Sequence, residues 1–305
     1  MTTVPRFSIV VPAYNAEDTL AETLDAVIAQ TFDDWECVVV DDGSTDTTLA
    51  TARSYAEKDA RIRVVHQENQ GTAGAYNAGV RAATGTFVVL CSADDIVLPE
   101  HLVEMTRFIE CEGGYDIYST NGYFWRPEDG LRQLVYPPGT RDSVMSLTLT
   151  DVIRVCFFSV GAAYRRDLFE RVGGYRQDVF GEDYDFWLRA MASGARHRYL
   201  PEALSLHRVS RTQKSADLDR AYRSDIRLVT DLRDAFDLSA EESAAVDQTV
   251  RDRERMIERR AEPSIVGGAR RSLSRVARRI LGDDRVNRVT AWLRSNGPGR
   301  PSNDG

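Results

Sequence analysis

The chain has 305 residues, which is enough for one large domain or two modest ones with a well-buried core. Its content of 42% hydrophobic and 28% charged residues lies near the globular average and argues against a fibrous, wholly disordered or multi-span membrane protein. The net charge of -8 is uneven, because residues 251–305 hold 14 Arg against 7 Asp and Glu while the preceding body is acidic. An acidic body argues against nucleic-acid binding across its surface, which needs many cationic contacts.

The first third alternates between apolar strands and amphipathic helices, as in an α/β domain with a largely parallel sheet. The periodicity predicts strands at 7–11, 36–40, 62–66 and 86–91, and helices at 18–30, 47–57 and 73–83. Pro99 stands in the first turn of a further helix, which ends before Gly113.

After residue 115 the pattern changes to strands and loops, so the sheet is expected to become mixed. The predicted elements are a hairpin of strands at 116–125 and 131–136, a helix at 142–155, a strand at 157–164 and a short helix to Val172. From Ser215 onward the signals are helical, and Ser239 with Glu242 forms a capping box. Residues 297–305 are expected to be disordered.

Targeting and redox signals point to a cytoplasmic protein. The N-terminus lacks the charged region and long apolar stretch of a signal peptide, and no apolar run reaches the length of a membrane span. The cysteines have no metal-ligand spacing, so we expect reduced, structural thiols. They are Cys37, Cys91, Cys111 and Cys156.

Polar segments follow three of the predicted strands, at residues 12–14, 41–43 and 94–95. Ligands of open α/β sheets bind at the carboxyl ends of strands, near the point where strand order reverses, so these segments are candidates for one site. Glycine-rich phosphate loops are absent, and adjacent carboxylates such as residues 94–95 can hold Mg²⁺ or Mn²⁺ for a phosphate ligand. Each Asp pair alone is more often a turn or a helix entry.

Taken together, the segments resemble the inverting family-2 nucleotide-sugar glycosyltransferases, which have the GT-A fold. The resemblance runs from about Phe7 to Ser215 and rests on FSIVVPAYNAEDTL, VVVDDGSTDTT, NQGTAGAYNAG, LCSADDIVLPEHL and RRDLFERVGGYRQDVFGEDYDFWLRA. It implies an α/β fold with a Rossmann-like open mixed sheet flanked by helices. We expect a GT-A domain over 1–214, with a nucleotide-binding half at about 1–112 and an acceptor half at about 113–214. The helical signals after it predict a helical extension over 215–262.

The resemblance also implies an activity, which is transfer of a sugar from a nucleotide diphosphate sugar to a hydroxyl with inversion. UDP is the default nucleotide, and the enzyme would be a metal-dependent transferase of the hexosyl type that uses Mn²⁺ or Mg²⁺. The acceptor would be a glycan or a lipid-linked molecule in the synthesis of cell-surface polysaccharide or glycoconjugates.

Carried over by position, the resemblance implies that Asp95 binds the metal, with Asp94 beside it at the ribose and diphosphate. Asp183 would be the general base, with Glu182 in the acceptor site. The implied donor pocket is completed by Pro12, Ala13, Tyr14, Asp42, Gly71 and Arg208. Displacement at the anomeric carbon needs a base on the acceptor face and a cation on the leaving-group face, which these residues would supply.

Two aromatic residues follow the expected base. We expect partial desolvation beside Phe186 and Trp187 to raise the pKa of Asp183 toward the working pH, and Trp187 to stack on the acceptor or sugar. In isolation, the acidic run at 182–185 is also typical of a first helical turn, where carboxylates match the helix dipole.

The sequence departs from the family pattern at two places. Tyr76 stands before Asn77, where the family often has a basic residue, so an expected donor contact is missing or supplied elsewhere. Ser210 stands where related enzymes place a His that ligates metal, which leaves His207 as an alternative ligand. A lone His is more often packed or solvated.

Two interpretations of the basic tail stay open. Residues 263–296 are expected to form amphipathic helices that lie on an anionic membrane surface, at about 1 kcal/mol per cation, on the inner face of the plasma membrane. Alternatively, their apolar faces pack on the catalytic domain or on a second subunit. The helices after Ser215 likewise offer a surface for a homodimer.

Two other functions compete with transfer. One is a catalytically silent relative that acts as a scaffold or sugar-binding protein, although the joint presence of Asp42, Asp94, Asp95 and Asp183 argues against decay. The other is a glycoside hydrolase, which also uses paired carboxylates but needs no nucleotide or metal motif at strand ends.

Overall fold

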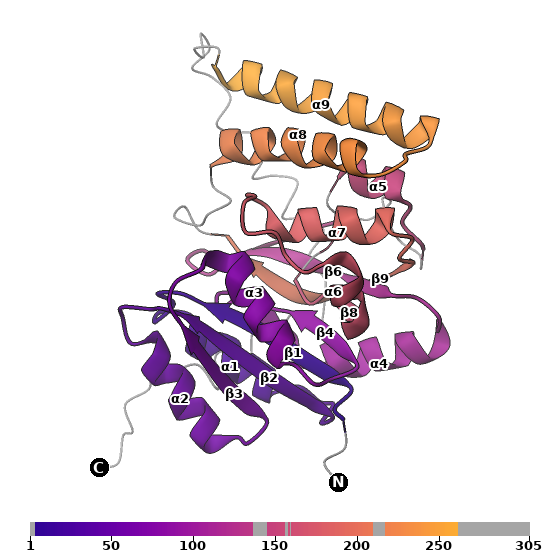
Figure 1. Ribbon diagram of the computed structural model, residues 1–305. Helices are drawn as coiled ribbons and strands as arrows, with labels where there is room; N and C mark the ends of the chain where they lie inside the picture. Colours follow the sequence, from indigo (N-terminus) through magenta and orange to yellow (C-terminus); the bar gives the residue numbers. More distant parts are fainter. Residues whose placement is uncertain (1–3, 137–144, 156–157, 159, 210–216, 262–305) are drawn as a thin grey trace, which may run out of the picture. The chain divides into compact units, whose positions relative to one another are not determined.

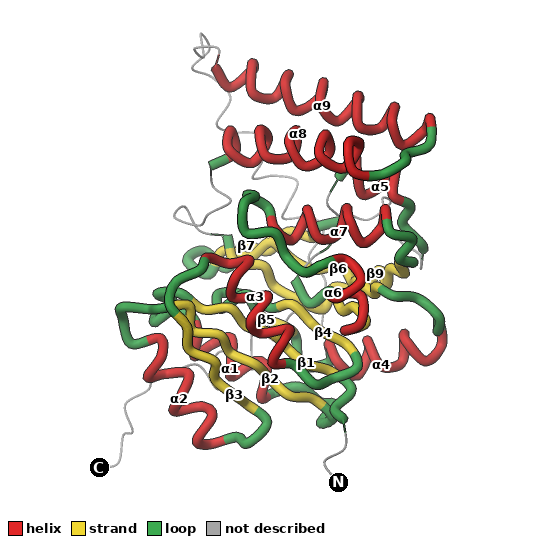
Figure 2. Tube along the Cα trace, in the orientation of Figure 1, coloured by secondary structure: helices red, strands yellow, loops and turns green. Residues whose placement is uncertain are grey.

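A mixed sheet with helices on both faces forms most of the described chain (Figure 1; Figure 2). This computed structural model describes residues 4–136, 145–155, 158, 160–209 and 217–261. The strands are β1 (Phe7–Ala13), β2 (Trp35–Asp42), β3 (Ile62–Gln67), β4 (Phe87–Leu90), β5 (Ile96–Val97), β6 (Ile117–Arg126), β7 (Leu131–Leu134), β8 (Ala163–Arg165) and β9 (His197–Arg208). The helices are α1 (Leu20–Ile28), α2 (Thr48–Lys58), α3 (Gly71–Ala82), α4 (His101–Cys111), α5 (Leu149–Arg154), α6 (Arg166–Val172), α7 (Glu182–Ala192), α8 (Leu218–Ala235) and α9 (Ala240–Ala261).

Continuous apolar runs build the first half of the sheet, in which β3, β2, β1 and β4 lie side by side and run parallel. β1 and β2 are buried along nearly their whole length because helices cover both faces. Leu24 of α1 and Met105 of α4 pack on one face, and Val80 of α3 packs with Val10 on the other. The predicted strands and helices of this half are confirmed to within a few residues. Strand order reverses between β1 and β4, which places the ends of these strands at the expected ligand position.

The second half of the sheet is mixed, as the change of pattern after residue 115 predicted. β8 runs antiparallel to β4, β6 runs antiparallel to β8, and β9 returns parallel to β6. The β6–β9 pairing shifts register around Asn121, where Gly122 lies against Ser205 so closely that a Cβ would stand 2.6 Å from the Ser205 Oγ. The two-residue β5 pairs with the end of β9. That pairing brings the residues after β4 next to His207, although the two segments are far apart in sequence.

Two predictions in this half need correction. The helix expected from residue 142 begins at Leu149, because Thr148 and Asp151 form a capping box with hydrogen bonds of 2.9 and 3.2 Å, and Met145 pairs with Tyr199 as a β-bridge. The strand expected from residue 157 is shortened to β8. Residues 142–144, 156–157 and 159 lie outside the described residues.

The predicted helical extension is present as the α8–α9 pair, which packs on α5 and α7 (Figure 1). Leu228, Leu232 and Val246 are buried in this layer. The capping box at the start of α9 is confirmed, with a hydrogen bond of 2.8 Å from the Ser239 N–H to Glu242. The predictions for residues 263–296 and 297–305 fall outside the described residues. Among the helices that are described, none has the length and apolar character needed to cross a bilayer.

Three of the cysteines lie within the described residues. Cys37 and Cys91 are buried and Cys111 is exposed, and all three are free. Burial raises the pKa of the Cys91 thiol well above its usual value, which makes a reactive thiolate unfavourable. Cys156 lies outside the described residues.

Candidate active site

The loops after β1 and β2 are fastened together at the carboxyl edge of the sheet. Asn15 adopts a left-handed conformation with φ of 48°, and its side-chain oxygen accepts a hydrogen bond of 2.9 Å from the Thr45 N–H. Its own N–H donates to the Ser44 Oγ at 3.1 Å. These bonds place Tyr14, which is 51% exposed, beside the end of β2. Pro12 and Ala13, the other expected pocket residues here, are half-buried and buried.

Asp42 ends β2 and fixes the start of α3. Its Oδ1 accepts hydrogen bonds from the Gln67 side chain at 2.7 Å and from the Gln70 N–H at 2.9 Å. Gly71 follows with φ of 75°, a conformation that favours glycine. We expect the Asp42 carboxylate to bind the nucleotide base. One of its oxygens also fixes the loop before α3.

The Asp94–Asp95 pair follows β4 and meets the end of β9. The Arg208 N–H donates to Asp95 Oδ1 at 2.9 Å, and His207 Nδ1 lies 3.1 Å from the same oxygen. The Thr23 hydroxyl donates to the Asp95 carbonyl at 2.9 Å, so α1 also holds this turn. Asp95 is buried at 1% exposure.

The electrostatics of this pair indicate a shortage of positive charge. Burial raises the pKa of Asp94, the adjacent Asp95 charge raises it further, and His207 and Arg208 offset only part of the increase. For His207, burial lowers the pKa, but the hydrogen bond and charge of Asp95 and the charges of Asp94 and Asp183 outweigh it, so the net shift is upward. A cation bound here would relieve the crowding of the carboxylates.

Arg208 is held beside the carboxylate pair. Its guanidinium donates to the Asp94 carbonyl at 2.9 Å, pairs with Glu22 of α1 and lies 4.6 Å from the centre of the Trp125 ring. Glu22 is a residue that the sequence motifs did not single out, and its partner is 186 positions away.

A cavity of about 260 Å³ joins the strand ends to the start of α7. Asp95 and His207 line it from the sheet, and Asp183 lines it from α7. The remaining lining residues are mostly aromatic, apolar or hydroxyl side chains: Tyr76, Leu90, Ser92, Gly122, Tyr123, Phe124, Val135, Tyr136, Phe158, Val160, Ala162, Trp187 and Ser205. The structure therefore brings the expected metal ligand and the expected base to one cavity.

The base segment folds as the first turn of α7, after Gly181 with φ of 79°. Asp183 is exposed, with Oδ1 accepting a hydrogen bond of 2.8 Å from the Tyr184 N–H, whereas Glu182 is buried at 7% exposure. Phe186 and Trp187 are buried, and the rise in the pKa of Asp183 that we expect from partial desolvation beside them stays a prediction.

The stacking role expected for Trp187 also stays a prediction. Trp187 lines the cavity, but it is buried at 2% exposure and its ring stacks on Phe158 with 4.4 Å between centroids. The edges of Tyr164 and Phe186 contact the same indole. Trp187 therefore packs against aromatic neighbours and also lines the cavity.

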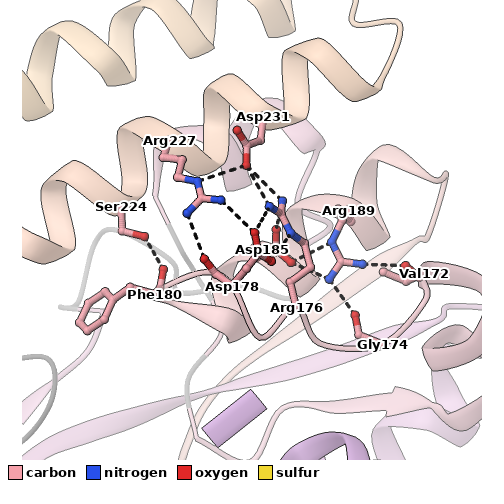
Figure 3. Close-up of polar contacts among 10 residues, drawn as sticks. All are labelled: Val172, Gly174, Arg176, Asp178, Phe180, Asp185, Arg189, Ser224, Arg227 and Asp231. Atoms are coloured by element: carbon pink, nitrogen blue, oxygen red, sulfur yellow. Dashed lines mark hydrogen bonds and ion pairs between the residues drawn. The ribbon is translucent and has the colours of Figure 1, made fainter. Parts of the chain in front are cut away.

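Asp185, the last carboxylate of the base segment, belongs to a separate cluster (Figure 3). It pairs with Arg189 at 2.6 Å and with Arg176 at 3.3 Å. Arg189 also donates to the carbonyls of Val172 and Gly174 at 2.6 and 2.8 Å, and thus fixes the turn after α6. Arg176 reaches across to Asp231 of α8 at 3.2 Å (Figure 3).

The residues fit a divalent cation bound with help from a substrate. Among the described residues, no group of three His, Cys, Asp or Glu side chains is arranged as a complete metal site. The Asp94–Asp95 pair nevertheless supplies carboxylate oxygens with an excess of negative charge. Mg²⁺ and Mn²⁺ sites of this kind use one or two carboxylates and complete their coordination with water and substrate phosphates.

Comparison with known families decides the assignment. The family model described as "Glycosyl transferase family 2" matches residues 8–173. This chain belongs to that family. It is 33% identical over 214 residues to the uncharacterized glycosyltransferase EpsJ of Bacillus subtilis, covering 67% of this chain and 61% of EpsJ. It is 29% identical over 234 residues to the uncharacterized glycosyltransferase YibD of Escherichia coli, covering 70% of this chain and 64% of YibD.

Solved structures show the fold of this family-2 chain. S. aureus TarS 1–349 in complex with UDP has a TM-score of 0.63 and 25% identity, over 82% of this chain and 70% of TarS. The mannosyltransferase PcManGT from Pyrobaculum calidifontis, in complex with GDP-Man and Mn²⁺, has a TM-score of 0.61 and 22% identity, over 97% of this chain and 82% of PcManGT. The expected GT-A fold, with an open mixed sheet flanked by helices, is confirmed.

Proposed function

We propose that this enzyme transfers a sugar from a nucleotide diphosphate sugar to a hydroxyl acceptor with inversion, using Mn²⁺ or Mg²⁺. The observation that carries the proposal is that Asp95, which follows β4, and Asp183, on α7, line one cavity of about 260 Å³. Asp95 is buried beside Asp94 in a pair short of positive charge, and Asp183 is exposed.

The two carboxylates have different tasks in this mechanism. Asp183 accepts the proton of the acceptor hydroxyl as its oxygen forms a bond to the anomeric carbon and the bond to the diphosphate oxygen breaks. Asp95 and Asp94 would hold the cation, which when bound neutralises the charge of the leaving nucleotide diphosphate. Attack from the face opposite the leaving group inverts the anomeric centre, which is why base and metal ligands come from different elements.

Other residues bind and orient the donor. Pro12, Ala13, Tyr14, Asp42 and Gly71 surround the nucleotide at the ends of β1 and β2. Arg208, which Glu22 holds beside Asp94, would bind the diphosphate. Glu182 adjoins the base on the acceptor side.

UDP is the nucleotide with the best support, since the TarS structure contains it. The hydroxyl acceptor is a glycan or a lipid-linked molecule. The further expectations of membrane attachment through residues 263–296 and of a homodimer stay predictions.

A thermal-unfolding series tests this function directly. Purified protein is melted with UDP, GDP or dTDP, each with and without Mn²⁺, and the series is repeated on Asp95→Asn and Asp183→Asn. A ligand at 100 times its Kd stabilises by about 2.7 kcal/mol, which corresponds to several degrees at this size.

We expect Mn²⁺-dependent stabilisation by one nucleotide, lost in Asp95→Asn and kept in Asp183→Asn. Release of nucleotide from the matching sugar donor should be lost in both variants. If no nucleotide at millimolar concentration raises the melting temperature, the assignment of the donor site is wrong. The silent relative or the hydrolase then becomes the better hypothesis.

A further inference from the structure

We propose that Tyr76, together with Ser92, selects a neutral sugar at the donor position by hydrogen bonding its hydroxyl groups. The inference rests on the proposed function, because it concerns the sugar that this site transfers. Tyr76 would be a specificity-determining residue rather than a base or a metal ligand.

The backbone around Tyr76 is fixed by a pair of reciprocal hydrogen bonds. The side-chain amide of Asn77 donates to the Tyr175 carbonyl at 2.8 Å and accepts from the Tyr175 N–H at 2.8 Å. The Tyr76 ring packs on the Tyr175 ring with 5.1 Å between centroids, and Tyr76 is 6% exposed. A ring held in this way presents its hydroxyl at one place.

That hydroxyl is held only loosely by the protein. Tyr76 lines the cavity, and its oxygen lies 3.5 Å from the Ser92 Oγ, which lines the same cavity. This separation is longer than the range of about 2.5 to 3.0 Å for O–H···O hydrogen bonds. A buried hydroxyl and a half-buried one at this spacing are able to form shorter bonds with a ligand placed between or above them.

The surroundings keep the phenol protonated, so it remains a donor. Burial raises the pKa of Tyr76 well above its usual value, and the negative charges of Asp183, Glu182 and Asp95 raise it further, while Ser92 opposes them. These carboxylates belong to both sides of the proposed reaction. The Tyr76 hydroxyl therefore lies near the carboxylates of the leaving-group side and near the proposed base. The transferred sugar must bind between these two sides.

The charge of the cavity selects against an anionic sugar. Among the described residues that line it, the acidic or basic side chains are Asp95, Asp183 and His207, and none is Arg or Lys. With the cation of the proposed function held at Asp95, a sugar carboxylate would still face the Asp183 carboxylate, whereas a neutral sugar meets hydroxyls and aromatic rings. The volume of about 260 Å³ is below the usual range for drug-sized ligands and suits a single ring.

The test compares two variants that each remove one buried phenolic hydroxyl and keep the ring. Tyr76→Phe removes the hydroxyl that lines the cavity. Tyr175→Phe removes one that lies 3.3 Å from the Tyr164 hydroxyl, and Tyr175 is outside the cavity lining. Each protein is assayed with Mn²⁺ for binding of UDP and GDP, and for binding and hydrolysis of UDP-glucose, UDP-N-acetylglucosamine, GDP-mannose and UDP-glucuronate. Melting temperature without ligand reports folding.

We expect the wild type to use a neutral donor and not UDP-glucuronate. Tyr76→Phe should weaken kcat/KM for that donor by about 10- to 100-fold, while the affinity for the free nucleotide changes less than about twofold. Tyr175→Phe should stay within about threefold of the wild type in both measurements. Ser92→Ala, a second variant of the hydroxyl pair, should reproduce the same split between donor and free nucleotide.

Two results would overturn the inference and leave the proposed function intact: a Tyr76→Phe enzyme equal to the wild type on its best donor, or a wild type that prefers UDP-glucuronate. A wild type that binds neither nucleotide with Mn²⁺ would instead remove the proposed function, and the inference with it.

Discussion

Two buried acidic regions of this protein are compensated in opposite ways. The strand-end cluster consists of Asp94, Asp95, His207 and Arg208, and the helix cluster consists of Arg176, Asp185, Arg189 and Asp231 (Figure 3). Asp95 and Asp185 are 1% and 3% exposed, so both have lost nearly all contact with water. Asp185 contacts two guanidinium groups directly, whereas Asp95 contacts a backbone N–H and a titratable imidazole.

The difference distinguishes a structural carboxylate from a ligand-binding one. A buried carboxylate surrounded by permanent cations has its charge satisfied by the fold itself. In the strand-end cluster the pKa of Asp94 is raised by burial and by Asp95, which means that the fold holds negative charge it does not fully neutralise. Negative charge that the fold leaves unneutralised is typical of functional sites, where a bound ligand supplies the compensating positive charge.

The sharpest test of the comparison is Asp95→Asn, for which we expect the largest effect on activity. Turnover should fall by about 10³-fold or more, because the leaving-group charge loses its stabilisation. The melting temperature without ligand should stay the same or rise, since the amide oxygen can still accept from Arg208 and the repulsion with Asp94 is gone. Nucleotide release and thermal unfolding measure the two quantities. A large loss of stability would mean that Asp95 is structural.

Asp185→Asn should show the reverse pattern and serves as the matched control. It leaves Arg176 and Arg189 without their shared charge and should lower the free energy of unfolding by about 2–3 kcal/mol. The folded enzyme should keep its kcat within a few fold, because Asp185 does not line the cavity. Denaturant unfolding and kinetics below the transition check this, and a kcat loss as great as that of Asp95→Asn would erase the distinction.

The sequence predicted one cluster well because strand topology assembles it. Asp42 ends β2 and Asp94 follows β4, and these parallel strands lie on either side of β1. The carboxyl ends of neighbouring parallel strands lie at the same edge of a sheet. The contribution of β9 could not be foreseen in the same way. Only two residues of β5 pair with β9, and the paired residues Leu206 and Ile96 are more than a hundred positions apart in the sequence. The local hydrophobic pattern cannot predict a partner that lies so far away in the sequence.

The helix cluster shows a different limit. Asp183 and Asp185 are two positions apart on α7, so their side chains point to widely separated directions of a 3.6-residue turn. Only one of them can face the cavity, and the resemblance chose Asp183, which the structure places there. The partners of Asp185 come from the loop before α7, from α7 itself and, through Arg176, from α8. The burial of Trp187 and Phe186 could not be predicted either, because it depends on Phe158 and Tyr175, which only the fold brings close.

Glu36 is a third buried carboxylate, and its charge is compensated in a way intermediate between the two clusters. It gives a prediction about pH. Ser8 donates to it at 2.7 Å, the Thr84 N–H at 2.5 Å and Arg63 at 2.7 Å. Burial raises the pKa of Glu36, but these hydrogen bonds outweigh burial and lower it below 4.5. A lowered pKa in the folded state stabilises the protein above the unfolded value, and that stabilisation is lost as the pH falls through the folded value.

Glu36→Gln should therefore cost about 1–2 kcal/mol at pH 7, and the difference from the wild type should shrink as the pH falls below about 4.5. Denaturant unfolding at pH 7, 5 and 4 measures this difference. Activity at pH 7 should be unchanged, because Glu36 is remote from the cavity lining. A difference that is constant with pH would show that the hydrogen bonds do not depend on the carboxylate charge.

The smallest effect is expected at the outer edge of the helix cluster. Arg227 of α8 contacts the Asp178 carboxylate at 2.9 Å and Asp231 at 3.7 Å, but its side chain is 52% exposed (Figure 3). Arg227→Gln should lower the free energy of unfolding by less than about 1 kcal/mol, and 1 M salt should remove most of that cost. The cost of Asp185→Asn should survive the same salt, because Asp185 itself is buried and its ion pairs are less screened than those of Arg227. Parallel unfolding curves for both variants at low and high salt measure this contrast. If both costs vanished together, the helix cluster would be a surface network throughout, and the contrast with the strand-end cluster would rest on Asp95 alone.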